Sequence, residues 1–137
     1  MRITHKYYPY SILITVIVCY LSLFNPSEMG IENFNIWDKL VHTIMYFGVS
    51  SVFWFEYLWN HYKKPHTSGM LLFTMVFPVV LGGVLELAQE YLTECRSGEW
   101  VDFIANSLGV IFGAVAGWWI GIPVIGHLRQ SKDNKDE

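Results

Sequence analysis

The sequence predicts an all-α fold, a membrane bundle of four transmembrane helices. Of its 137 residues 53% are hydrophobic and only 15% are charged, and the mean hydropathy is +0.31, which is too apolar for an ordinary soluble domain of this size. The apolar residues gather in four stretches that are long enough to cross a bilayer, which takes about 20 residues. Because lipid offers no partners for backbone amides, each stretch is expected to be helical.

The predicted spans cover residues 7–24, 37–59, 69–92 and 100–122. The first follows Arg2 and Lys6 as a signal peptide would, but no small-residue cleavage site comes after it, so we assign it as a span. The two cysteines, Cys19 and Cys95, suggest no disulfide framework. We expect one domain over residues 1–126 and a polar cytoplasmic tail, residues 127–137, that is disordered.

Lysine and arginine residues set the predicted orientation. They concentrate in the two terminal segments and in the connection after the second span, all on one side of an even-numbered bundle: Arg2, Lys6, Lys63, Lys64, Arg129, Lys132 and Lys135. We therefore predict a multi-pass protein of the cytoplasmic membrane with both termini in the cytoplasm. Membrane lipid is the expected surrounding partner, and nothing in the charge pattern indicates nucleic-acid binding.

Polar residues recur near the extracytoplasmic ends of the last three spans. A spacing of four places side chains on one helical face, and this spacing occurs in each of these spans. The second span carries Asp38, His42 and Tyr46 at this spacing, with Lys39 beside them; the third ends with Glu86, Gln89 and Glu90; the fourth opens with Asp102 and Asn106.

Three of these residues, His42, Glu86 and Asn106, lie about 8 to 10 Å below the same predicted surface when the rise per residue is counted. Charges at that depth are costly unless they face water, a bundle interior or one another. The alternative to a functional cleft is a hydrogen-bond network that only packs helices. The number of ionisable groups favours an outward-facing cleft. In the opposite half we interpret Glu56 as snorkelling, or as pairing with Lys63 or Lys64.

Small residues repeat every four positions in the last span: Gly109, Gly113, Gly117 and Gly121. This spacing lets two helix backbones approach closely. The partner helix can belong to the same chain or to a second copy, so a homo-oligomer through these glycines stays open. Pro78, with Gly82 and Gly83, is expected to kink the third span below Glu86 and to open space beside the polar layer.

Two segments, "DKLVHTIMYF" in the second span and "ELAQEYLTECRSGEWVDFIANSLGVIFG" across the third and fourth, resemble the VanZ-like family of small bacterial membrane proteins. The resemblance covers residues 37–117. The positions that match the family's polar pattern are Asp38, Lys39, His42, Tyr46, Glu86, Gln89, Arg96, Asp102 and Asn106. One departure is "TEC" before Arg96, where proline or glycine is expected.

The resemblance implies a role in the cell envelope, since the family takes its name from an association with resistance to teicoplanin, a glycopeptide that acts outside the cell. One hypothesis is an enzyme acting on an anionic lipid-linked or cell-wall-precursor substrate. Its catalytic candidates exchange protons, and its ligand-binding candidates hold the substrate, with arginine suited to a two-pronged grip on phosphate or carboxylate. The catalytic set is His42, Glu86, Asp38 and Asp102; the ligand-binding set is Lys39, Tyr46, Gln89, Arg96 and Asn106.

A second hypothesis is a non-catalytic protein that binds a lipid or antibiotic, or assists an envelope enzyme. A divalent metal held by Asp38, His42, Glu86 and Asp102 is a third alternative. Repulsion by Lys39 and Arg96, and the absence of an HxxxH or HExxH spacing, argue against it. We therefore predict no metal and no cofactor, and we leave open whether the protein is an enzyme.

Overall fold

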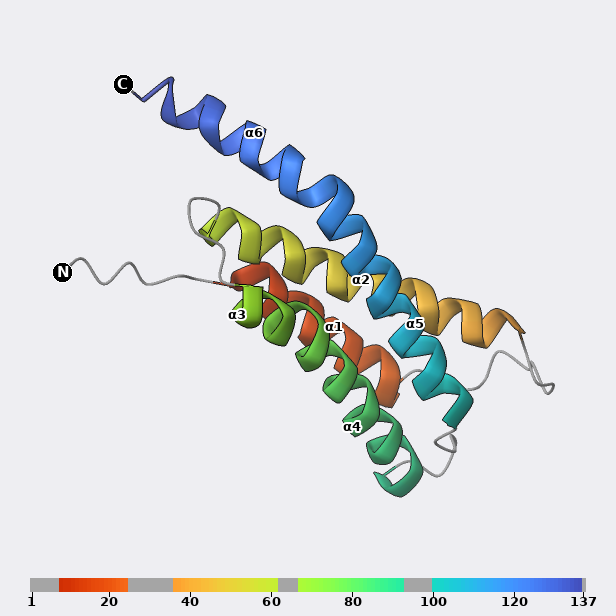
Figure 1. Cartoon of the computed structure of the whole chain (residues 1–137). Helices are drawn as coiled ribbons and strands as arrows, with labels where there is room; N and C mark the ends of the chain where they lie inside the picture. Colours follow the sequence, from red (N-terminus) through yellow and green to blue (C-terminus); the bar gives the residue numbers. More distant parts are fainter. Residues whose placement is uncertain (1–7, 25–35, 62–66, 93–99, 137) are drawn as a thin grey trace.

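The structure, a computed structural model, describes residues 8–24, 36–61, 67–92 and 100–136. Every regular element in these ranges is helical, which confirms the all-α class. The elements join into four continuous helical segments, two of which contain a π-helical turn (Figure 1). They are α1 (Pro9–Phe24); α2 (Ile36–His61); α3 (Thr67–Leu71), η2 (Leu72–Val76) and α4 (Phe77–Leu92); and α5 (Trp100–Ala116), η3 (Gly117–Gly121) and α6 (Ile122–Asp133).

Helices α2 and α5 form the most extensive contact in the bundle, and α1 and α4 pack around them. The beginning of α2, the end of α4 and the beginning of α5 meet at one end, where Lys39 contacts Asp102 and Asn106 contacts Glu86. At the other end α6 continues the line of α5 and projects beyond the other helices toward the C-terminus (Figure 1). This topology decides which polar residues share a site.

The glycine repeat forms a seam against α2 of the same chain. A Cβ atom added to Gly109 would lie 2.3 Å from the Thr43 carbonyl oxygen, and one added to Gly113 would lie 2.6 Å from the Ser50 Cβ. At Gly117 an added Cβ would lie 2.5 Å from the Trp54 ring. Only glycine allows this approach of two helices. Within this chain the helix that packs against these glycines is α2, and a homo-oligomer through them stays a prediction.

The described helices expose large apolar side chains along much of their length. Examples are Ile12 and Val16 on α1, Val84 on α4, and Ile104 and Phe112 on α5. Two segments, Thr67–Leu92 and Trp100–Asp133, are long and apolar enough to cross a membrane, and Pro9–Leu23 is a shorter apolar helix. An apolar surface of this extent is unusual for a soluble monomer and is the surface that lipid would cover.

The π-helical turn η2 precedes Pro78, where the sequence predicts a kink. Proline has no amide hydrogen, so the carbonyl four residues earlier, that of Thr74, loses its usual helical partner. The Ser50 hydroxyl of α2 lies 3.2 Å from this carbonyl oxygen and 3.2 Å from that of Val110. One buried serine thus joins the third segment to the α2–α5 pair, next to the glycine seam.

The Glu56 carboxylate holds the beginning of α1. It is buried and accepts hydrogen bonds from the backbone amides of Tyr10, at 2.9 Å, and Ser11, at 2.8 Å. The first amides of a helix have no partner within it, and a carboxylate also interacts favourably with the helix dipole there. The prediction that Glu56 snorkels is therefore wrong, and the alternative pairing with Lys63 or Lys64 lies outside the described residues.

The polar tail is helical as far as Asp133, so the prediction of a disordered segment is wrong for residues 127–133. Two contacts explain why the helix continues past the apolar span. Ile125 is buried in a core cluster that includes Trp54 and Tyr57 of α2, and the Arg129 guanidinium carbon lies 4.8 Å from the centre of the Trp59 ring. Once a helix exists, each added residue needs little further stabilisation, so these contacts are enough.

Candidate functional site

Three helices bring polar side chains together at the end of the bundle where α2 and α5 begin. Helix α2 supplies Lys39 and His42 from one face, α4 supplies Glu86, and α5 supplies Asp102 and Asn106. We call these five residues the polar cluster. All but Lys39 are at most 7% exposed. The convergence expected from helical spacing and depth is present, while the binding and catalytic roles stay predictions.

The Asn106 amide bridges His42 and Glu86. Its nitrogen donates to Glu86 Oε1 at 3.2 Å, and its oxygen lies 2.9 Å from His42 Nδ1. An amide oxygen only accepts, so His42 carries a proton on Nδ1, and in the neutral ring Nε2 bears the lone pair. Glu86 Oε1 also lies 3.8 Å from His42 Nδ1. The chain of contacts fixes the orientation of the imidazole.

Lys39 and Asp102 form an ion pair between α2 and α5. The Lys39 ammonium donates to the Asp102 Oδ1. The Lys39 side chain is 16% exposed and that of Asp102 is 5% exposed, so the lysine lies on the surface side of the pair. Below it the Thr43 hydroxyl lies close to the backbone carbonyls of Lys39 and Ala105, which ties the two helices together. Lys39 is therefore the most exposed group of the cluster.

Tyr46 lies one turn below His42 and borders the cluster. A Cβ atom added to Gly82 would lie 3.3 Å from the Tyr46 ring edge and 3.3 Å from the Asn106 Cβ. Glycine at this position therefore leaves room for both side chains. The ring is buried, and its hydroxyl makes no hydrogen bond with any residue that the structure describes. A buried hydroxyl without a partner is rare and calls for an explanation.

The remaining predicted residues lie elsewhere or are not described. The Gln89 amide donates to the Ser22 carbonyl at 2.8 Å and holds the end of α1, although it was predicted to bind ligand. Asp38 is the third residue of α2, but its side chain lies outside the described part, as does all of Arg96. Two buried polar residues make contacts that sequence reasoning missed, because their partners are 24 to 60 positions away: Ser50, and Glu56, which was expected to snorkel.

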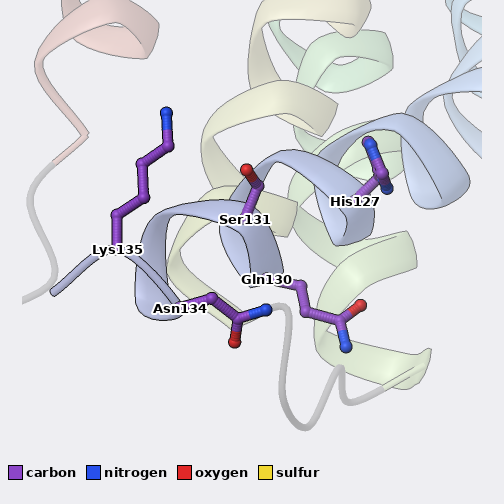
Figure 2. A pocket seen from close by; sticks show the side chains of 5 residues that line it. All are labelled: His127, Gln130, Ser131, Asn134 and Lys135. Atoms are coloured by element: carbon purple, nitrogen blue, oxygen red, sulfur yellow. The ribbon is translucent and has the colours of Figure 1, made fainter. Parts of the chain in front are cut away.

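A surface hollow at the end of α6 is lined by residues of that helix and of the turn after it (Figure 2): His127, Gln130, Ser131, Asn134 and Lys135. They repeat at helical spacing along its exposed face. Asp102 and His127 lie in one continuous helical segment, so 25 residues of helix, about 37 Å, separate the hollow from the polar cluster. The hollow gathers no buried titratable group and adds nothing to the chemistry of the cluster.

Chemically, the polar cluster combines a cation near the surface, an imidazole with a fixed orientation and two buried carboxylates. Such a set can hold an anion, exchange a proton or ligate a cation. Comparison with family models, with curated proteins and with solved structures gives no match. The resemblance to the VanZ-like family therefore rests on the sequence motifs alone.

Proposed function

We propose that this chain is a VanZ-like protein of the bacterial cytoplasmic membrane that binds, or acts on, an anionic lipid-linked or cell-wall-precursor ligand at the polar cluster. The observation that carries the proposal is the meeting of Lys39, His42, Glu86, Asp102 and Asn106 from three helices in one buried place. Isolated polar residues in apolar helices would be explained by packing. Here a Lys39–Asp102 pair and a His42–Asn106–Glu86 network lie side by side, with donor atoms of His42, Glu86 and Asp102 within 4.8 Å of one another. Four ionisable groups gathered in this way match a site for a charged ligand.

The proposed topology has four spans, both termini in the cytoplasm and the cluster near the extracytoplasmic leaflet. Support comes from the two segments that are long and apolar enough to span a membrane and from the basic residues of the termini and the connection at residues 62–66. A site at this depth would be open to lipid headgroups and to wall precursors after their export. An effect on a glycopeptide that acts outside the cell would follow from that position.

Lys39 is proposed to receive the anionic group of the ligand. Its ammonium already holds one carboxylate oxygen, that of Asp102, so a phosphate or carboxylate of the ligand would take over or share this contact. His42 lies deeper, with Nδ1 held by Asn106, and would exchange a proton through Nε2 if the ligand is transformed. Arg96, by its place in the sequence, would assist as a second cation.

The direct test is ligand binding by the purified full-length chain. Vesicles that contain a polyprenyl-phosphate lipid should bind the chain more tightly than vesicles of zwitterionic lipid. Lys39→Met should weaken that preference at least tenfold, whereas Lys132→Met, an exposed lysine of α6, should leave it unchanged. Equal binding of both vesicle types, or equal effects of both substitutions, would contradict the proposal.

Turnover separates an enzyme from a binding protein. With a lipid-linked wall precursor in excess, mass spectrometry should detect a converted product if the cluster is catalytic, and only stoichiometric, unchanged ligand if it is not.

In a susceptible bacterium that expresses the chain, tolerance to teicoplanin should be lost on His42→Gln and kept on His127→Gln, a histidine at the exposed hollow of α6. Tolerance that survives His42→Gln would remove the histidine from the mechanism.

A further inference from the structure

His42, Glu86 and Asp102 form a possible set of ligands for a metal ion. Each offers one donor atom, all three donors lie within 4.8 Å of one another, and all three residues are buried. Each comes from a different helix, so the geometry is set by packing of the bundle. Donor atoms around one small divalent ion lie roughly 3 to 3.5 Å apart. Small side-chain rotations that move each donor atom by about 1 Å would therefore bring the three donors around an ion.

Tyr46 supplies an independent observation. It is 1% exposed, and its hydroxyl makes no hydrogen bond with a described residue. Its ring edge and the Asn106 side chain both lie beside Gly82, at the border of the cluster. A buried hydroxyl at such a place needs a hydrogen-bond partner or an ion. A metal-bound water, or the metal itself, would supply the missing partner.

We propose that the polar cluster binds one divalent first-row transition-metal ion through His42, Glu86 and Asp102. One imidazole nitrogen and two carboxylate oxygens suit Zn²⁺ or Mn²⁺, and they suit Ca²⁺ poorly, since it takes oxygen ligands only. Asn106 is a positioning residue, because its amide oxygen accepts from Nδ1 and so leaves the lone pair of the neutral ring on Nε2. The inference does not depend on the ligand proposed above, since the metal can be measured alone.

Lys39 is proposed to compete with the ion for Asp102. Its ammonium occupies the carboxylate oxygen that the metal would take, and like charges repel at this distance. Metal binding should therefore turn Lys39 toward the surface, where its side chain is already partly exposed. This makes an unusual prediction, because removal of a polar residue should strengthen binding.

The test uses the full-length chain in detergent after treatment with a chelator. Titration with Zn²⁺ and with Mn²⁺ should give about one bound ion per chain, and Ca²⁺ should not displace it. Glu86→Gln and Asp102→Asn, which preserve shape, should weaken binding at least tenfold. Glu90→Gln, one turn further along α4 and exposed, should bind as the unaltered chain does.

Lys39→Met should bind Zn²⁺ at least tenfold more tightly, which a merely structural role of the cluster would not produce. If Glu86→Gln fails to fold, this variant and the absorption spectrum of bound Co²⁺, which reports nitrogen and oxygen ligands, still decide the matter. No binding at millimolar Zn²⁺, or unchanged binding in both carboxamide variants, would overturn the metal site. Either result would leave the vesicle-binding test of the proposed function standing.

Discussion

The α2–α5 interface has two halves that are built in different ways. At one end Lys39 and His42 of α2 meet Asp102 and Asn106 of α5 through side-chain atoms. Further along the same two helices the glycine seam brings the backbones together, with Gly109 against the Thr43 carbonyl. One half is joined by charge and hydrogen bonds, and the other by steric fit.

The two halves differ in how much they are expected to stabilise the helix pair. Close packing of small residues stabilises a helix pair in lipid through van der Waals contact, and at the seam the Ser50 hydroxyl adds hydrogen bonds to the Thr74 and Val110 carbonyls. Buried ion pairs contribute little net stability, because desolvation offsets the attraction. The seam can therefore hold the two helices together, whereas stability alone does not account for the ionisable side chains of the polar end.

The largest loss of stability is expected when the seam is altered. Gly109→Ala would place a Cβ atom 2.3 Å from a backbone oxygen that cannot rotate away, so the helices must separate. We expect the free energy of unfolding in mixed micelles to fall by about 3 kcal/mol, the upper part of the range for overpacking.

Gly48→Ala is the matched control for this substitution. Gly48 lies on α2, the partner helix of Gly109, but a Cβ atom added to Gly48 would meet no atom within 4 Å. The free energy of unfolding should change by no more than about 0.5 kcal/mol. If Gly109→Ala were as stable as Gly48→Ala, the close approach of α2 and α5 would be wrong.

A smaller loss is expected at the amide that bridges the polar end. Asn106→Ala removes the donor to Glu86 and the acceptor for His42, both buried, and should cost about 2 kcal/mol. Ser107→Ala, at the next position, removes only a hydroxyl that bonds to the Phe103 carbonyl of its own helix, and should cost less than about 0.5 kcal/mol. Equal losses in thermal unfolding would show that the bridge is not a distinct interaction.

Ser50 lies where the seam meets the third segment. Ser50→Ala leaves the Thr74 carbonyl, already deprived of a helical partner by Pro78, without the hydroxyl 3.2 Å away. The expected cost is about 1 kcal/mol. The neighbouring Ser51→Ala loses only a contact with the Phe47 carbonyl one turn back and should leave the unfolding midpoint unchanged. A midpoint shift in Ser51→Ala of the same size would contradict this assignment.

Much of the polar end could be predicted from sequence, because the helical face and the depth of a residue both follow from its position along its own helix. A spacing of four put Asp102 and Asn106 on one face, and the rise per residue put His42 and Glu86 at one depth. The glycine repeat likewise indicated a close helix contact. Helical periodicity is a property of each segment alone, so these features needed no knowledge of the fold.

Contacts between faces of different helices could not be predicted in this way. Glu56 meets amides of α1 that lie 45 and 46 positions earlier, and Gln89 meets the Ser22 carbonyl 67 positions earlier. Both depend on how each helix is rotated about its axis, which is decided by packing of the whole bundle. The helical course of residues 127–133 was missed for a related reason, since its contact with Trp59 is tertiary.

The smallest change in stability is expected when the ion pair of the polar end is replaced as a unit. Lys39→Met with Asp102→Leu removes both charges and leaves apolar side chains of similar size, and buried pairs replaced in this way are often neutral or stabilising. We expect the free energy of unfolding to stay within about 1 kcal/mol of the unaltered chain, while the preference for anionic vesicles is lost. Asp102→Leu alone should be the less stable variant, because it leaves the Lys39 charge without its carboxylate. If the double variant is destabilised as strongly as Gly109→Ala, both halves of the interface are structural, and the polar end has no claim to a separate chemical role.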